Sequence, residues 1–240
     1  MTVRSRTPTA LRTALGAITA FGTALAIVVV LGLALQPSFA DNGPTALDAH
    51  VTRWFVEHRT SVLTAVMRAM TWLGSSAVIV PITVVGVGVL LTRHRGRSAA
   101  YLAVAVAGAS LLSTLAKHVI GRDRPPVPVR LAHVVSSSFP SGHATQATAT
   151  YAALAVVACV SIQERRARAA IWGAAIVAVA LVGVSRVYLG VHWATDVVGG
   201  WILGACWTAG LTTAFRPLGP DGRTGSSDSF DPGGATRRSA

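Results

Sequence analysis

The stretch from residue 99 to residue 125, AAYLAVAVAGASLLSTLAKHVIGRDRP, joins an apolar run to a polar cluster and decides the fold. Residues 99–116 carry no charge, and Lys117 is the first charged side chain after them. A run of this length can cross the hydrocarbon core of a bilayer as a helix. Only helices and closed barrels satisfy their backbone hydrogen bonds in lipid, and a continuous apolar run favours the helix. The stretch therefore predicts a transmembrane helix that ends in a polar cluster.

Apolar runs of this kind recur along the chain. Hydrophobic residues make up 52% of the 240 residues and charged residues 12%, a balance that excludes an ordinary soluble globular protein. The sequence predicts an all-α, polytopic membrane bundle with six transmembrane helices, at about Ala14–Leu35, Gly74–Thr92, Ala99–Ala116, Ala144–Ile162, Ala169–Ser185 and Val197–Phe215. We expect a cytoplasmic N-terminus over residues 1–13, one domain over residues 14–216, and a disordered cytoplasmic tail over residues 217–240, which hold few large apolar side chains.

The basic residues predict the orientation of the bundle. The formal net charge is +12, but the basic side chains lie at the ends of apolar runs rather than on one face, which argues against a nucleic-acid partner. By the positive-inside rule, four arginine-bearing segments are cytoplasmic: Arg4, Arg6 and Arg12; Arg93, Arg95 and Arg97; Arg165, Arg166 and Arg168; and Arg216. We therefore expect a multi-pass protein of the cell membrane whose remaining polar clusters face the extracytoplasmic side.

The N-terminal part of the chain leaves two alternatives open. Ser38-Phe39-Ala40 resembles a signal-peptidase site, but the apolar run before it is longer than a usual signal core, so we expect an uncleaved helix. Cleavage would leave five spans and the same outward-facing site. Apolar residues between positions 47 and 70 recur at helical spacing, with a break near His58, and predict an amphipathic helix or helix pair at the outer interface. This segment would either cap the bundle or line a lateral entrance for a lipid.

Small residues inside the last predicted span indicate how the helices pack. Gly200 and Gly204 form a small-xxx-small pair, which predicts a close helix contact within the bundle rather than a dimer seam. Cys159 and Cys206 both lie inside apolar spans, so we expect packing residues rather than a disulfide or a metal pair.

The first two polar clusters flank the third and fourth spans. Lys117 and Arg124 follow the third span, and the proline after Arg124 biases that residue toward an extended conformation, so that both cations can point at one spot. Ser141 and Gly142 begin the fourth span, where we expect Ser141 to cap the helix and Gly142 to let a ligand approach the backbone. Free N–H groups at a helix start form an anion site, and His143 stands at its rim.

The third cluster brings a histidine and a carboxylate together before the sixth span. His192 and Asp196 are four residues apart and share one face if the helix begins early. The carboxylate would then fix the imidazole tautomer and leave the other ring nitrogen free to attack. Arg186, six residues before His192, can bind phosphate oxygens with its bidentate fork.

Together the three clusters resemble the type 2 phosphatidic acid phosphatase family, whose pattern is K-x6-R-P, then P-S-G-H, then S-R-x5-H-x3-D. Every fixed position of that pattern is matched, over a resemblance that covers roughly residues 45 to 215. The resemblance implies a six-helix membrane fold with its site at the outer surface.

The resemblance also implies a two-step phosphoryl transfer that needs no metal and no cofactor. His192 would be the nucleophile that forms a phosphohistidine, His143 would protonate the leaving alkoxide, and Asp196 would orient His192. The remaining fixed residues would bind the phosphoryl oxygens: Lys117, Arg124, Ser141, Gly142 and Arg186. Fixed cations would stabilise the transition state as magnesium does in other phosphoryl-transfer enzymes.

The predicted partner is a lipid phosphate that enters from the membrane. A polyprenyl pyrophosphate is favoured because the site faces outward, with phosphatidic acid and phosphatidylglycerol phosphate next. Two other classes compete: a vanadate-dependent haloperoxidase-like oxidoreductase, whose pocket is similar, and a non-catalytic lipid-binding or transport protein on the same scaffold. The membrane spans argue against the first, and the presence of both histidines argues against the second. The sequence predicts no oligomeric state.

Four more ionisable residues lie in the first outer loop but outside the fixed positions of the family: His118, Arg122, Asp123 and Arg130. They could tune head-group preference. We expect instead that Asp123 pairs with a neighbouring arginine and that the others are solvated.

Overall fold

The computed structural model describes residues 9–35 and 44–215, and every regular element in these residues is helical. The predicted tail at residues 217–240 and the peptidase-like Ser38-Phe39-Ala40 lie outside the described residues. The helices are α1 (Thr9–Leu35), α2 (Pro44–Glu57), α3 (Ser61–Trp72), α4 (Ser76–Thr92), α5 (Gly96–Ile120), the 3-10 helix η2 (Val127–Val129), α6 (Gly142–Cys159), α7 (Arg165–Tyr188) and α8 (Ala194–Ala214).

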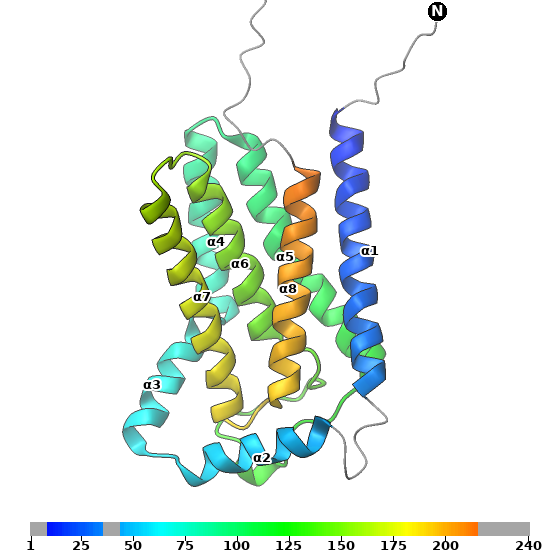
Figure 1. Ribbon diagram of the computed structural model, residues 1–240, viewed down its shortest axis with the longest axis vertical. Helices are drawn as coiled ribbons and strands as arrows, with labels where there is room; N and C mark the ends of the chain where they lie inside the picture. Colours follow the sequence, from blue (N-terminus) through cyan, green and yellow to red (C-terminus); the bar gives the residue numbers. More distant parts are fainter. Residues whose placement is uncertain (1–8, 36–43, 216–240) are drawn as a thin grey trace, which may run out of the picture.

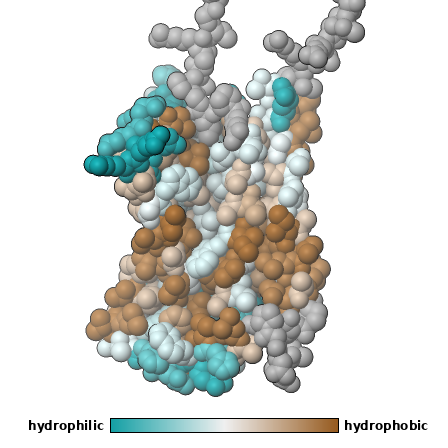
Figure 2. Space-filling model, in the orientation of Figure 1, coloured by the Kyte–Doolittle hydropathy of each residue, from teal (hydrophilic) through white to brown (hydrophobic). Residues whose placement is uncertain are grey.

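The long helices form an elongated bundle with α6 at its centre (Figure 1). Helices α1, α4, α5, α6, α7 and α8 run along the long axis, whereas α2 lies across one end and α3 leads from it into α4. Helix α6 packs against α5, α7 and α8, and α1 packs against α5 and α8. Hydrophobic residues predominate over the middle of the face shown in Figure 2, and hydrophilic residues gather toward its two ends. This distribution suits a bundle immersed in a bilayer.

Five stretches of the described residues are long and apolar enough to cross a membrane: Thr9–Leu35, Ser61–Thr92, Gly96–Ile120, Arg165–Tyr188 and Ala194–Ala214. The second of these joins α3 to α4 across residues 73–75. The predicted fourth span forms α6, which is not among the five, so the number six stays a prediction. Helix α6 is largely buried among its neighbours, and its buried residues include the polar Thr145, Thr148 and Thr150.

The glycine pair of α8 makes the close helix contact that its spacing predicts. A Cβ atom added to Gly200 would lie 2.7 Å from the carbonyl oxygen of Ser141, and one added to Gly204 would lie 2.7 Å from that of Thr145. Both partners belong to the start of α6 or its N-cap, so α6 and α8 approach backbone to backbone. Both cysteines are free, as expected.

The amphipathic segment is a helix pair, α2 and α3, that breaks between Glu57 and Ser61. Several of its large apolar side chains are exposed: Leu47, Trp54, Val62, Val66 and Trp72. The break itself is anchored, because Arg59 donates hydrogen bonds to the carbonyl oxygens of Tyr188 (2.7 Å) and Val129 (2.8 Å). This anchor holds α2 over the end of the bundle where α7 ends and α8 begins.

Candidate active site

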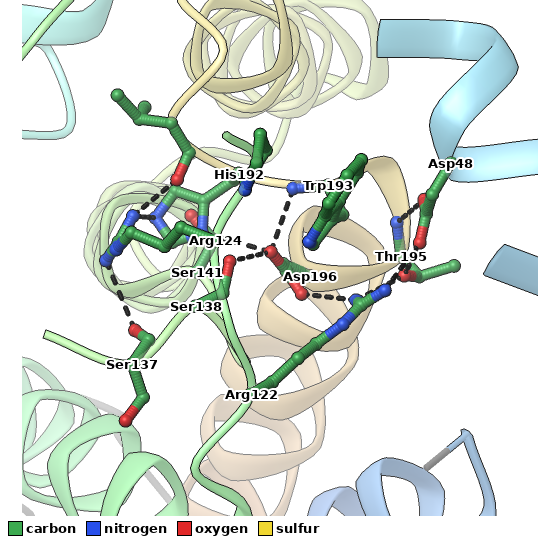
Figure 3. Close-up of polar contacts among 12 residues, drawn as sticks. Asp48, Arg122, Arg124, Ser137, Ser138, Ser141, His192, Trp193, Thr195 and Asp196 are labelled. Carbon is green, nitrogen blue, oxygen red and sulfur yellow. Dashed lines mark hydrogen bonds and ion pairs between the residues drawn. The ribbon is translucent and has the colours of Figure 1, made fainter. Parts of the chain in front are cut away.

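The three polar clusters meet at the end of the bundle that α2 covers. Gly121, with a φ of 65°, ends α5 in the left-handed region and turns the chain that follows Lys117 back over the bundle. Ser141 is the N-cap residue of α6, and its N–H donates to the carbonyl oxygen of Asp196 (2.9 Å) in the first turn of α8. His192 lies in the turn between α7 and α8. The fold therefore gathers all three motifs at one place (Figure 3).

His192 and Asp196 make the contact that their spacing predicts. Nδ1 of His192 lies 3.3 Å from Oδ2 of Asp196, and both side chains are buried, with 2% and 0% of their surface exposed. The same Oδ2 accepts hydrogen bonds from the backbone N–H of Trp193 (2.8 Å) and from the hydroxyl of Ser138. A carboxylate fixed in this way holds the proton of the imidazole on Nδ1 and leaves the lone pair on Nε2.

Burial lowers the pKa of His192 to about 3, because it disfavours the charged imidazolium. Asp196 raises that pKa, but the nearby charges of Arg124 and Arg186 lower it further. The imidazole is therefore neutral at physiological pH. Its Nε2 lies 3.2 Å from Nη1 of Arg124, which places a cation directly beside the nitrogen that would attack.

This lowered pKa predicts that acid destabilises the protein. An unfolded histidine binds a proton below about pH 6.5, whereas His192 in the folded protein stays neutral down to about pH 3. The unfolded chain then holds more protons, so the free energy of unfolding should fall by about 1.4 kcal/mol per pH unit from this residue between those values. Thermal unfolding in detergent at about pH 7 and about pH 4.5 tests this. His192→Gln should lose stability less steeply than the wild type; equal pH dependence of the two would contradict the prediction.

Lys117 and Arg124 converge on one short loop, as their predicted role requires. The ammonium of Lys117 donates to the carbonyl oxygen of Ser137 (2.5 Å). The guanidinium of Arg124 donates to the carbonyl oxygens of Ser136 (2.6 Å), Ser137 (3.2 Å) and Val191 (2.5 Å). Burial, chiefly, lowers the pKa of Arg124 to about 10, so it remains a cation at neutral pH. Two cations thus reach the same carbonyl group, at a point next to His192.

Ser141 and Arg186 each carry a buried polar atom that makes no hydrogen bond within the described residues: Oγ of Ser141 and Nε of Arg186. Nη1 of Arg186 donates to the hydroxyl of Thr71 on α3 (2.8 Å), which makes α3 part of the wall of the site. The expectation that the Ser141 side chain caps α6 was wrong, because its hydroxyl accepts no bond from the first turn of that helix. Buried polar atoms without partners are costly, and these two lie on residues that the motifs single out.

Gly142 and His143 complete the site at the start of α6. Gly142 is the first residue of the helix, where backbone N–H groups have no partner within the helix. His143 is half-buried and lies within electrostatic range of four of the other predicted site residues: Lys117, Arg124, Arg186 and His192. The structure therefore brings together every residue that the motifs single out. Each motif contributes at least one charged or polar group to this cluster.

The charged residues of the loop between α5 and α6 behave differently from the expectation. Arg122 is only 7% exposed and forms ion pairs with Asp196 (2.5 Å) and with Asp48 of α2 (2.8 Å). Asp123 is exposed, and no ion pair links it to an arginine in the part of the chain that the structure describes. Solvation was thus the wrong prediction for Arg122. Arg130 is half-buried and donates to the carbonyl oxygen of Pro125 (2.6 Å), whereas His118 is exposed as expected.

An integral membrane phosphatase is the class of protein that these features define: apolar helices, a neutral histidine held by a carboxylate, and cations converging beside it. The chain belongs to the PAP2 superfamily, whose family model matches residues 98–219. The resemblance to the type 2 phosphatidic acid phosphatases is thereby confirmed. The protein is a hydrolase of phosphate ester or diphosphate bonds.

Individual relatives agree with this assignment. The chain is 35% identical to phosphatidylglycerophosphatase B of Bacillus subtilis, over 72% of this chain and 85% of the relative. It is 26% identical to an undecaprenyl-diphosphatase of Sulfolobus acidocaldarius, over 68% of this chain and 75% of the relative. The crystal structure of the PAP2-type phosphatidylglycerolphosphate phosphatase of Bacillus subtilis superimposes with a TM-score of 0.71 at 30% identity, covering 79% of this chain and 94% of that one.

Proposed function

We propose that the protein removes the terminal phosphate of a membrane lipid by way of a phosphohistidine intermediate. One observation carries the proposal: Nδ1 of a neutral His192 lies 3.3 Å from Asp196, and its Nε2 lies 3.2 Å from the guanidinium of Arg124. The charge of Arg186 acts on the same imidazole. A phosphoryl group in transfer, with its three equatorial oxygens around phosphorus, fits such a set of donors.

In the first step, Nε2 of His192 attacks phosphorus, and the bond from phosphorus to the leaving oxygen breaks. Arg124, Lys117 and Arg186 neutralise the charge on the three equatorial oxygens, with the hydroxyl of Ser141 and the N–H of Gly142 as further donors. Asp196 keeps the proton on Nδ1 and stabilises the positive charge that the ring acquires.

His143 supplies the acid and base chemistry. It donates a proton to the leaving oxygen in the first step, so that the lipid departs as an alcohol or as a lipid monophosphate. In the second step the same nitrogen, now unprotonated, accepts a proton from water while the water oxygen attacks phosphorus. The bond from phosphorus to Nε2 then breaks, inorganic phosphate leaves, and His192 and His143 return to their starting states.

The relatives support a choice of substrate class. Phosphatidylglycerol phosphate is the first candidate, because the relative that is 35% identical is a phosphatidylglycerophosphatase, and a polyprenyl diphosphate is the second. We place the site at the outer face of the cell membrane. The arginine-bearing turn before α5 and the arginine-rich start of α7 support this orientation, because they lie at the end of the bundle opposite the site.

Phosphate release tests the proposal directly. Protein purified in detergent with EDTA should release phosphate from at least one of phosphatidylglycerol phosphate, undecaprenyl diphosphate and phosphatidic acid, and should leave a soluble sugar phosphate intact. Rapid quenching with a ³²P-labelled substrate should trap radioactivity on the protein in an acid-labile, base-stable form, as expected of phosphohistidine. Full turnover without such a species, or turnover that requires a divalent metal, would contradict the mechanism.

A further inference from the structure

Arg122 joins the buried carboxylate of Asp196, which contacts His192, to a second buried carboxylate, that of Asp48 (Figure 3). Its Nη1 donates to Oδ1 of Asp196 (2.5 Å), and its Nη2 donates to Oδ2 of Asp48 (2.8 Å). The two carboxylates are 0% and 1% exposed, and each lies 74 residues from Arg122 in the sequence. Burying an ion-pair triad costs free energy unless its charged groups are hydrogen-bonded. Both ion pairs of Arg122 are within hydrogen-bond distance.

Asp48 reaches this triad from the surface helix α2. Its carboxylate also accepts from the backbone N–H of Thr195 (2.9 Å) and from the hydroxyl of Thr195 (2.5 Å), so it caps the first turn of α8. Nη1 of Arg122 donates to the same hydroxyl (2.7 Å). A residue of α2 therefore fixes the start of the helix that carries Asp196. Asp48 lies outside the residues that the family model matches, which begin at residue 98.

The two oxygens of Asp196 have separate tasks in this arrangement. Oδ2 faces His192, the N–H of Trp193 and the hydroxyl of Ser138, whereas Oδ1 is held by Arg122. A bond on Oδ1 prevents the carboxylate from rotating away from the imidazole. We infer that Asp48 and Arg122 are positioning residues for His192, which act through Asp196, and this inference rests on the proposed function of the site.

The charges of the triad give the direction of the effect. Two carboxylates and one guanidinium carry a net charge of about −1, and this charge faces an imidazole that becomes positive when Nε2 forms its bond to phosphorus. If Asp48 lost its charge, Arg122 would be drawn to Asp196 alone and would neutralise it. The imidazolium would then be stabilised less, although the groups that bind the phosphate oxygens would be unchanged. The loss should therefore appear in kcat rather than in KM.

The test compares Asp48→Asn with Asp123→Asn. Both changes remove one carboxylate charge at the same end of the protein, but Asp123 is exposed and its side chain lies outside the triad. Asp48→Asn should lower kcat about tenfold or more, the loss seen when a residue that orients a metal-binding histidine is removed, with KM little changed. Asp123→Asn should match the wild type, and Asp48→Glu should recover part of kcat because it restores the charge. Equal kcat values for Asp48→Asn and Asp123→Asn, at similar melting temperatures, would overturn the inference.

Binding of orthovanadate, a mimic of the phosphoryl group in transfer, separates this inference from the proposed function. Asp48→Asn should weaken vanadate binding about tenfold, whether or not the lipid panel contains the true substrate. An unchanged vanadate Kd overturns the inference even if the wild type hydrolyses lipids, and a wild type that binds no vanadate overturns both proposals. If Asp48→Asn does not fold, Arg122→Lys replaces it, because a single ammonium keeps the charge but cannot bridge both carboxylates. Full kcat and vanadate affinity in Arg122→Lys would then be decisive against the inference.

Discussion

His192→Ala is expected to lower kcat on the order of 10⁴-fold or more, because removal of a nucleophile leaves only the binding groups to act on the substrate. The side chain is 2% exposed, its Nδ1 is held by Asp196, and its Nε2 lies 3.2 Å from Arg124. No other imidazole in the described residues is held by a carboxylate in this way. The measurement is phosphate release under single-turnover conditions, together with loss of the trapped ³²P-protein.

His118→Ala is the matched control for this experiment. His118 lies at the same end of the bundle, in the last turn of α5, but it is exposed and outside the pocket. Its removal should leave kcat unchanged. Because Asp196 keeps its bonds to Arg122 and Ser138 in His192→Ala, the variant should also retain its helical circular dichroism and a cooperative melting transition. A folded His192→Ala protein with wild-type turnover would rule out His192 as the nucleophile.

Arg186→Lys should lower kcat/KM by about 10² to 10³-fold although it keeps the positive charge, because loss of one preorganised donor to a developing oxyanion costs that much. The guanidinium donates from Nη1 to Thr71 (2.8 Å), while its buried Nε makes no hydrogen bond within the described residues. One edge of the planar group is thus fixed by the protein, which leaves the other for phosphate oxygens. A lysine cannot keep the bond to Thr71 and also present two parallel donors to phosphate oxygens, because its donors sit on a single atom.

The appropriate control is Arg68→Lys, an exposed arginine on α3 near Thr71. It should have wild-type activity. Thr71→Val gives a second comparison, since it removes the anchor of Arg186 and leaves the guanidinium in place; its loss of activity should be smaller than that of Arg186→Lys. If Arg186→Lys retains full kcat/KM, then Arg186 supplies charge alone, and the bidentate contact proposed for it is wrong.

The sequence predicted contacts between the candidate site residues where these depend on local spacing. The contact between His192 and Asp196 follows from one helical turn, and the convergence of Lys117 with Arg124 follows from a helix end, a glycine and a proline. The apolar runs likewise predicted the long helices. The central helix α6 was predicted as a helix and found as one, but it is not among the five stretches that are apolar enough to cross a membrane.

The remainder of the site could not be predicted because it depends on contacts between distant segments. Arg122 lies 74 residues from either of its carboxylate partners, and nothing in its neighbourhood distinguishes it from a solvated arginine. Thr71 reaches Arg186 from a helix that the spacing marked only as amphipathic. The prediction for the Ser141 hydroxyl was also wrong. The residue occupies the N-cap position of α6, but its side chain makes no capping hydrogen bond.

The loop carbonyls that hold Lys117 and Arg124 also bear on how the catalytic cycle ends. Oxygens of Ser136 and Ser137 already accept bonds from these cations, so an arriving anion must exchange with them rather than bind bare charge. In the proposed mechanism, a phosphoryl group in transfer makes a bond to His192 as well as to the cations, whereas inorganic phosphate makes bonds to the cations alone. The carbonyl groups of Ser136 and Ser137 would then compete more effectively with the product than with the transition state, and would favour its departure.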